Sequence, residues 1–202
     1  MRRLDVGRGL FLPEIWAIPM NTVTPGMQDL TPVEVITHHH RYCGLVPNSG
    51  KRVADILADS TTDIFELRKA VANTVGSRAK GMEFKEVSLK KNRILMVLLR
   101  GEHESPIHRS NRYVERKRYG TLIVVSGYLL SGILHLGSHP IPSLLLTENS
   151  TLPSFIGMTN VTFHSSIDDR LPSECGVAIV QRQFIEAVQL GDKPLPKQAM
   201  NR

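Results

Sequence analysis

The stretch TLIVVSGYLLSGILHL, residues 121–136, decides the fold, because it predicts two short strands joined at Ser126-Gly127. The antiparallel register that follows pairs Val125 with Tyr128, Ile123 with Leu130, and Thr121 with Gly132. One face of this hairpin is apolar at every second position, the period of a half-buried strand. Gly132 lies within the second strand, where a glycine predicts the sharp bend of a small barrel.

An earlier segment, residues 33–47, can be laid over this stretch residue by residue, and the similarity continues along the chain. The matched pairs include Val35 with Ile123, Tyr42 with Leu130, Gly44 with Gly132, and Val53 with Ile141. A looser match places Ile94 to Val97 on Val177 to Val180. Chance similarity between β segments is the alternative. The repeated order of hairpin, short helix, strand and final strand favours an internal duplication.

The sequence therefore predicts a mainly β (α+β) protein made of two related small barrel-like or rolled-sheet units, each with one short helix. The expected segments are an N-terminal extension (1–32), a first β unit (33–100), a basic linker (101–118), a second β unit (119–190) and a C-terminal tail (191–202). Each unit is so small that its core alone provides only marginal stability, so we expect the two units to share an interface or to oligomerise. The segment 94–99 is apolar on both faces, which predicts a central or interfacial strand.

The composition is that of an ordinary globular chain, with 202 residues, 41% hydrophobic and 22% charged. No apolar run is long enough for a membrane span. Prolines interrupt the first apolar run, which argues against a secretory signal. Translation from Met20 or Met27 is an alternative start, so the sequence does not decide whether residues 1–19 belong to the protein. Cys43 and Cys175 are far apart in the sequence and require no disulfide, so we expect a cytoplasmic protein.

The segment GEHESPIHRSNRYVERKR, residues 101–118, holds much of the positive charge of a chain whose net charge is +6. Its candidate nucleic-acid-binding residues are Arg109, Arg112, Arg116, Lys117 and Arg118, with Tyr113 and Tyr119 interleaved. Basic residues with aromatics can follow a phosphate backbone and stack on bases. The alternative is a solvated linker whose charges guard a strand edge.

Three consecutive histidines, His38 to His40, are the main pattern that suggests a metal ion. Neighbours on a strand face opposite ways, so only His38 and His40 could converge, and no carboxylate or cysteine lies beside them at ligand spacing. The sequence also lacks a nucleophile elbow, a phosphate loop and a dinucleotide fingerprint. We therefore predict no metal, no cofactor and no catalytic residue.

Two resemblances can be stated on these residues. The copies LIVVSGYLLSGILHL with PSLLLTENSTLPSFIGMTNV, and RYCGLVPNSGKRVADILADSTTDIFEL with KEVSLKKNRILMVL, resemble a family of uncharacterised bacterial proteins built from such units, a domain of unknown function. The pattern of strand, turn glycine and strand with a second glycine, here Gly127 and Gly132, is also similar to the Sm-like small barrel. The chain departs from that pattern by a helix after the second strand and by lacking the Asp-aromatic-Asn base pocket, which weighs against RNA binding.

The regular features of the sequence, including the structural glycines Gly44, Gly127 and Gly132, all concern architecture. They favour a non-catalytic binding or assembly module that acts through a protein partner or through self-association. A nucleic-acid-binding, Sm-like regulator is the second hypothesis. A small-molecule enzyme whose site forms only in an oligomer is the third.

Overall fold

The computed structural model describes residues 30–99, 117–136, 142–147, 152–165 and 173–191. The first half of the chain contains β1 (Leu30–Thr37), β2 (His40–Pro47), α1 (Val53–Ala58), β3 (Ile64–Thr74), β4 (Met82–Lys90), the 3-10 helix η2 (Lys91–Arg93) and β5 (Ile94–Leu99). The second half contains β6 (Lys117–Val125), β7 (Tyr128–Leu136), α2 (Pro142–Leu146), β8 (Phe155–Ser165), β9 (Glu174–Gln181), the 3-10 helix η4 (Arg182–Phe184) and β10 (Ile185–Leu190). The chain is therefore mainly β, with two short α-helices in the described segments.

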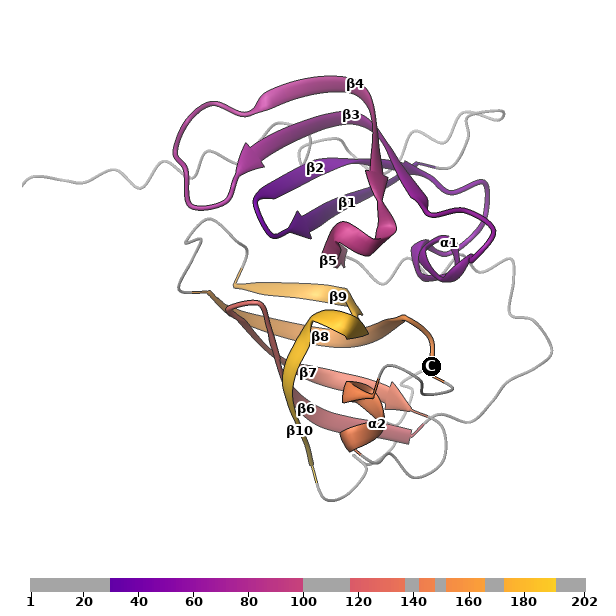
Figure 1. Cartoon of the computed structure of the whole chain (residues 1–202), viewed down its shortest axis with the longest axis vertical. Coiled ribbons are helices and arrows are strands. Elements are labelled where there is room, and N and C mark those ends of the chain that lie inside the picture. Colours follow the sequence, from indigo (N-terminus) through magenta and orange to yellow (C-terminus); the bar gives the residue numbers. More distant parts are fainter. Residues whose placement is uncertain (1–29, 100–116, 137–141, 148–151, 166–172, 192–202) are drawn as a thin grey trace, which may run out of the picture.

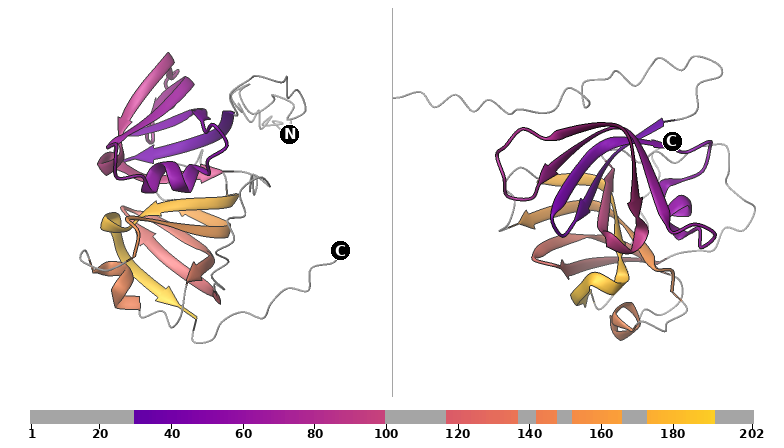
Figure 2. Two further views of the ribbon diagram at one scale, coloured as in Figure 1. Left: turned by 90° about the vertical axis from the view of Figure 1, so that its right-hand side faces the viewer. Right: turned by 45° about the horizontal axis from the view of Figure 1, so that its top comes forward.

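The described strands form one ten-stranded sheet in the order β10-β6-β7-β8-β9-β5-β1-β2-β3-β4. The strands of every neighbouring pair are antiparallel. Figure 1 shows the two halves one above the other, with β4 at the top and β6 and β10 at the bottom, and the side view in Figure 2 shows β9 lying against the first half. Pairing of β5 with β9 joins the halves, so β4 and β10 are the two ends of the sheet.

The prediction of small barrels is wrong, because the sheet is open. Within the first half β5 pairs with β1 and not with β4. The three-residue helix η2 connects β4 to β5. The second half has the same arrangement, with β10 beside β6 and η4 after β9. Since the fourth and fifth strands of a half do not pair with each other, neither half closes.

The two halves share one order of elements: two strands, an α-helix, two strands, a 3-10 helix and a fifth strand. This order corrects the looser sequence match. By position in the order β5 corresponds to β10, and β9 corresponds to β4, so the match of 94–97 with 177–180 is wrong. That match also makes 177–180 the final strand of the second copy, whereas β10 follows β9.

The hairpin of β6 and β7 has the register expected from the sequence, with Thr121 opposite Gly132. Its turn contains Ser126 and Gly127, whose φ angles are 44° and 82°. Positive φ at both central residues is the geometry of a type I′ turn, whose twist matches that of the flanking strands. The apolar face predicted for the hairpin is buried, which confirms the alternation.

Gly132 lies where β7 loses its regular register with β8, and Gly44 lies at the same place between β2 and β3. A Cβ atom on Gly132 would come within 3.0 Å of the Thr159 carbonyl oxygen, and one on Gly44 within 3.2 Å of the Ala70 Cβ. Opposite each glycine a non-glycine residue has positive φ: Asn160 at 51° and Lys69 at 48°. The glycines thus admit the close backbone approach that a bulge requires.

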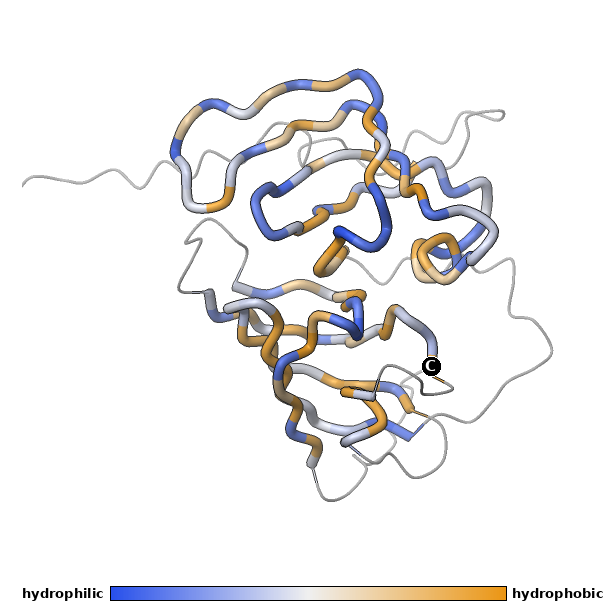
Figure 3. The backbone as a smooth tube through the Cα atoms, viewed as in Figure 1, coloured by the Kyte–Doolittle hydropathy of each residue, from blue (hydrophilic) through white to orange (hydrophobic). Residues whose placement is uncertain are grey.

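Two clusters of buried side chains form the core, and each contains residues of both halves. The larger cluster, mainly from β6–β10, includes Leu95, Met96 and Leu98 of β5. The smaller, mainly from β1–β5, includes Phe155 of β8 and Ile179 of β9. All six residues of β5 are buried, which confirms the prediction of a central strand. In Figure 3, β5 is a short hydrophobic segment between the halves, whereas hydrophobic and hydrophilic residues alternate along β4.

Candidate functional site: the strand edges

The junction between β5 and β9 shows how an edge of one half binds an edge of the other. Its register pairs Met96 with Val180, Val97 with Ile179, Leu98 with Ala178, and Leu99 with Val177. Side chains alternate across the junction, so that each strand contributes to the core of its own half and to the core of the other half. The result is a continuous apolar layer on both faces of the sheet.

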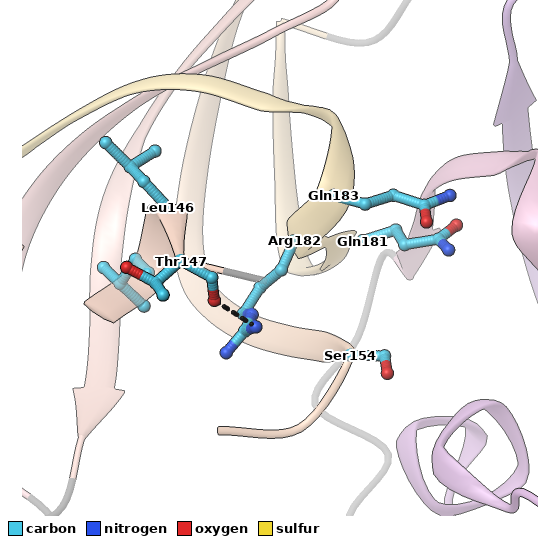
Figure 4. Close-up of a pocket in the computed structure, with 7 residues that line it drawn as sticks. Leu146, Thr147, Ser154, Gln181, Arg182 and Gln183 are labelled. Atoms are coloured by element: carbon cyan, nitrogen blue, oxygen red, sulfur yellow. Dashed lines mark hydrogen bonds between the residues drawn. The ribbon is translucent and has the colours of Figure 1, made fainter. Parts of the chain in front are cut away.

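A polar contact closes one end of this junction. The Gln181 amide, oriented so that both its groups are paired, donates to the carbonyl oxygens of Ile94 and of Lys91 (2.9 Å for Lys91) and accepts from Gln183 Nε2 (3.0 Å). Gln183 Nε2 also donates to the Asn92 carbonyl oxygen at 3.1 Å. Figure 4 shows Gln181 and Gln183 extending away from Arg182. The side chains around η4 therefore bind the backbone of η2 in the other half.

An aromatic contact also crosses the junction. His38, in the turn between β1 and β2, meets the Phe184 ring edge-on, with ring centroids 5.0 Å apart. His40 lies beside Tyr42, with ring centroids 6.0 Å apart. Both histidines are exposed, and the described part of the chain contains no group of three or more His, Cys, Asp or Glu side chains that could hold a metal ion. His38 therefore has a packing role at the junction.

The outer edges of β4 and β10 differ from the internal junction in their side chains. On β4 only Leu89 is buried, with Phe84 and Val87 half-buried; on β10 only Ile185 is buried, with Val188 and Leu190 half-buried. The other residues of both strands are exposed and mostly polar, including Glu86, Ser88, Lys90, Glu186 and Gln189. Charged residues on an edge strand limit indiscriminate strand addition. In the described part of the chain, the outer edges are therefore more polar and more exposed than the strands of the internal junction.

Two buried cations hold the 3-10 helices beside these edges. Lys91, 7% exposed, donates from Nζ to the carbonyl oxygens of Ile56 (2.6 Å) and Asp59 (2.7 Å) at the end of α1. Burial lowers the pKa of the Lys91 ammonium, and the carboxylates of Asp59 and Asp63 act in the opposite direction. The ammonium thus satisfies carbonyl groups that the short helix leaves without partners.

Arg182 has the corresponding position in the second half. Its Nη2 donates to the Thr147 carbonyl oxygen (2.9 Å), just after α2, and its Nη1 donates to that of Leu152 (3.3 Å). Figure 4 shows the first of these bonds across a pocket, which is lined by Leu145, Leu146, Thr147, Ser154, Gln181, Arg182 and Gln183. No carboxylate, imidazole or thiol is among these lining residues. The pocket is therefore built around a structural arginine and not around a reactive group.

Other buried polar groups are also structural. Glu34 and Arg41 form an ion pair on neighbouring strands, with Arg41 Nε 3.2 Å from Glu34 Oε1. The two cysteines, Cys43 and Cys175, are buried and form no disulfide. Burial, with a smaller contribution from the Glu34 carboxylate, raises the pKa of the Cys175 thiol to about 12. Cys175 is therefore a neutral thiol at pH 7 and a poor nucleophile.

The structure describes only some of the candidate nucleic-acid-binding residues. Arg109, Arg112 and Arg116 lie outside the described residues, while Lys117 and Arg118 are the first residues of β6, opposite Leu136 and His135. Lys117 is exposed and Arg118 is half-buried. No helix in the described ranges is long and apolar enough to cross a membrane.

Sequence reasoning missed Lys91 and Arg182, although each lies at the turn between the last two strands of its half. Their signal was a cation at the turn between two strands, which also occurs in solvated turns. It missed the edge residues of β4 and β10 as well, because an edge is defined only by the strand order.

Searches of protein-family models, curated proteins and solved structures found no match to the chain.

Proposed function

We propose that this protein is a non-catalytic assembly module that binds protein through the free edges of its sheet, β4 and β10. The observation that carries the proposal is the open sheet, which ends in two edges that no described strand covers. An open edge presents unpaired N–H and C=O groups, and addition of a strand satisfies them with a regular ladder of hydrogen bonds. The buried charged groups described above hold backbone and neighbouring strands, which accounts for them without a reaction.

We further propose that the two halves arose by duplication of one β-β-α-β-β-3-10-β unit. The shared element order supports this, and three details do so independently: positive φ at Lys69 and Asn160, glycines at Gly44 and Gly132 beside those residues, and a buried cation at the start of each 3-10 helix. A duplicated unit has the same two edges twice. One pair of edges is used at the internal junction, and the other pair is left for partners.

An affinity capture from cells that express the protein tests whether the edges bind partners. The edge variant Ser88→Lys/Ala187→Lys adds a charge to each free edge, at exposed positions that an added strand would cover. The control Ser60→Lys/His164→Lys adds the same charge at exposed positions away from both edges. We expect quantitative mass spectrometry to find proteins, including further copies of this chain, that the parent and control retain and the edge variant loses. Identical sets for all three would refute edge binding.

Nucleic-acid binding is a second candidate, favoured by the net charge of +6 and the basic segment 101–118. Under this hypothesis, changing Arg112, Arg116, Lys117 and Arg118 to glutamine flattens the salt dependence of binding to a fluorescent single-stranded RNA. The log–log slope should fall by about 0.7 for each phosphate that the variant no longer neutralises. The control changes the exposed Lys51, Arg52, Lys80 and Lys85 to glutamine. An unchanged slope in the first variant, or an equal change in the control, would count against this segment as the binding site.

A further inference from the structure

The two free edges are of the same two kinds that meet inside the molecule. The internal junction joins the fifth strand of the first half, β5, to the fourth strand of the second half, β9. The free edges are the fourth strand of the first half, β4, and the fifth strand of the second half, β10. We infer that a second copy of this chain occupies each edge, with β4 of one copy paired antiparallel to β10 of the next. This inference rests on the proposed function and names its partner.

The register can be transferred from the internal junction, because a 3-10 helix separates the fourth and fifth strands in both halves. Met96 is the third residue after η2 and Ala187 the third after η4, while Val180 and Leu89 each lie two residues before the start of a 3-10 helix. The pairing of Met96 with Val180 thus becomes a pairing of Ala187 with Leu89. The remaining pairs are Val188 with Ser88, Gln189 with Val87, and Leu190 with Glu86.

The next position in this register brings opposite charges together. Lys90 corresponds to Gln181, and Glu186 corresponds to Leu95. Gln181 and Leu95, at the internal junction, are both neutral. Both charged residues are exposed in the single chain. The transferred register places Lys90 opposite Glu186, and it places no like charges opposite each other. The Lys90 ammonium is also a donor suited to the carbonyl oxygens of Arg182 and Ile185, as the Gln181 amide is to those of Lys91 and Ile94.

The apolar content of the edges indicates a reversible contact. Pairing covers the half-buried Val87, Val188 and Leu190, whereas the internal junction covers side chains that are nearly all apolar. The contact is heterologous, because a different edge of each copy takes part. Such contacts give closed rings when the rotation between copies closes and open filaments when it does not. Each copy inside such an assembly therefore uses both of its edges.

A charge-reversal series measures the contact on the purified full chain by sedimentation velocity. Lys90→Glu and Glu186→Lys each place like charges opposite each other, and we expect each to weaken association about tenfold. The double variant Lys90→Glu/Glu186→Lys restores opposite charges and should associate more tightly than either single variant. Lys85→Glu makes the same change of charge on β4, at a position that faces no charged residue, and should leave association nearly unchanged. A double variant as weak as the single ones contradicts the inference.

Cysteine cross-linking tests the register. Ser88→Cys/Val188→Cys places thiols at directly paired positions of neighbouring copies, and oxidation should give a ladder of covalent multimers. Ser88→Cys/Leu190→Cys shifts one thiol by two residues, about 7 Å along the strand, which exceeds the reach of a disulfide. Equal yields for the two pairs would overturn the register. A parent chain that stays monomeric and gives no ladder would overturn self-assembly, while the proposed function would still stand if the edge variant loses other proteins in the affinity capture.

Discussion

Replacing Gly132 by valine should lower the free energy of unfolding by about 2 to 3 kcal/mol, because the new side chain meets backbone atoms that cannot move cheaply. A Cβ atom at this position lies 3.0 Å from the Thr159 carbonyl oxygen and 3.3 Å from that of Asn160, both on β8. Relief requires β7 and β8 to separate where β7 already has its register shift. Chemical denaturation followed by circular dichroism measures the loss.

Leu129→Val is the matched control, since Leu129 lies on the opposite, half-buried face of the same strand. Valine is the better strand former, so this change should cost less than about 1.5 kcal/mol. If Gly132→Val is as stable as the parent, the close approach of β8 is not a constraint and the account of the bulge is wrong. Gly44→Val should behave like Gly132→Val, because its Cβ would lie 3.3 Å from the Arg68 carbonyl oxygen.

Replacing Lys91 by methionine should lower the free energy of unfolding by about 2 to 3 kcal/mol, although a change of an exposed lysine is usually neutral. Methionine fills a similar volume but donates no hydrogen bond. The carbonyl oxygens of Ile56 and Asp59 then lose donors that lie 2.6 and 2.7 Å away. The end of α1 should loosen first, so amide hydrogen exchange in 53–58 should rise more than in the strands.

Lys80→Met is the control for this prediction, because Lys80 carries the same charge in an exposed turn. It should change the free energy of unfolding by no more than about 0.5 kcal/mol. Equal stability of the Lys91 and Lys80 variants would show that the buried ammonium does not stabilise α1. Two-state unfolding of both variants has to be checked, since the comparison depends on it.

The parts of the fold that could be predicted are those encoded locally. The turn Ser126-Gly127 fixes the register of β6 and β7, and alternation identifies their buried face. A strand with no polar face, β5, has to be central, because no solvent-facing strand can bury side chains on both sides. These conclusions needed only residues close together in the chain.

The open sheet could not be predicted in this way. Whether a fifth strand closes on the fourth or pairs with another half depends on contacts between residues far apart in the sequence, such as Leu98 and Ala178. The strand β10 was missed because an edge strand needs few buried residues, and only Ile185 is buried there. Helix, strand and turn propensities carry no information about such partners.

The candidate site could not be predicted from the sequence. The sequence led only to the hypothesis of a binding or assembly role, whereas the edges and the residues Lys90 and Glu186 could be found only from the strand order. Lysine is rarely buried, whereas the structure buries Lys91. Its burial depends on the carbonyl groups of α1, which lie elsewhere in the sequence.

Amide hydrogen exchange of the purified chain, measured over a range of protein concentrations, tests most directly whether the free edges are the working surfaces. The account predicts that 96–99 and 177–180 are protected at every concentration, because they form the internal junction. Protection at 86–89 and 187–190 should instead rise with concentration, and it should rise at both edges together. Protection at the two edges that does not depend on concentration, or that appears at one edge alone, would contradict head-to-tail assembly.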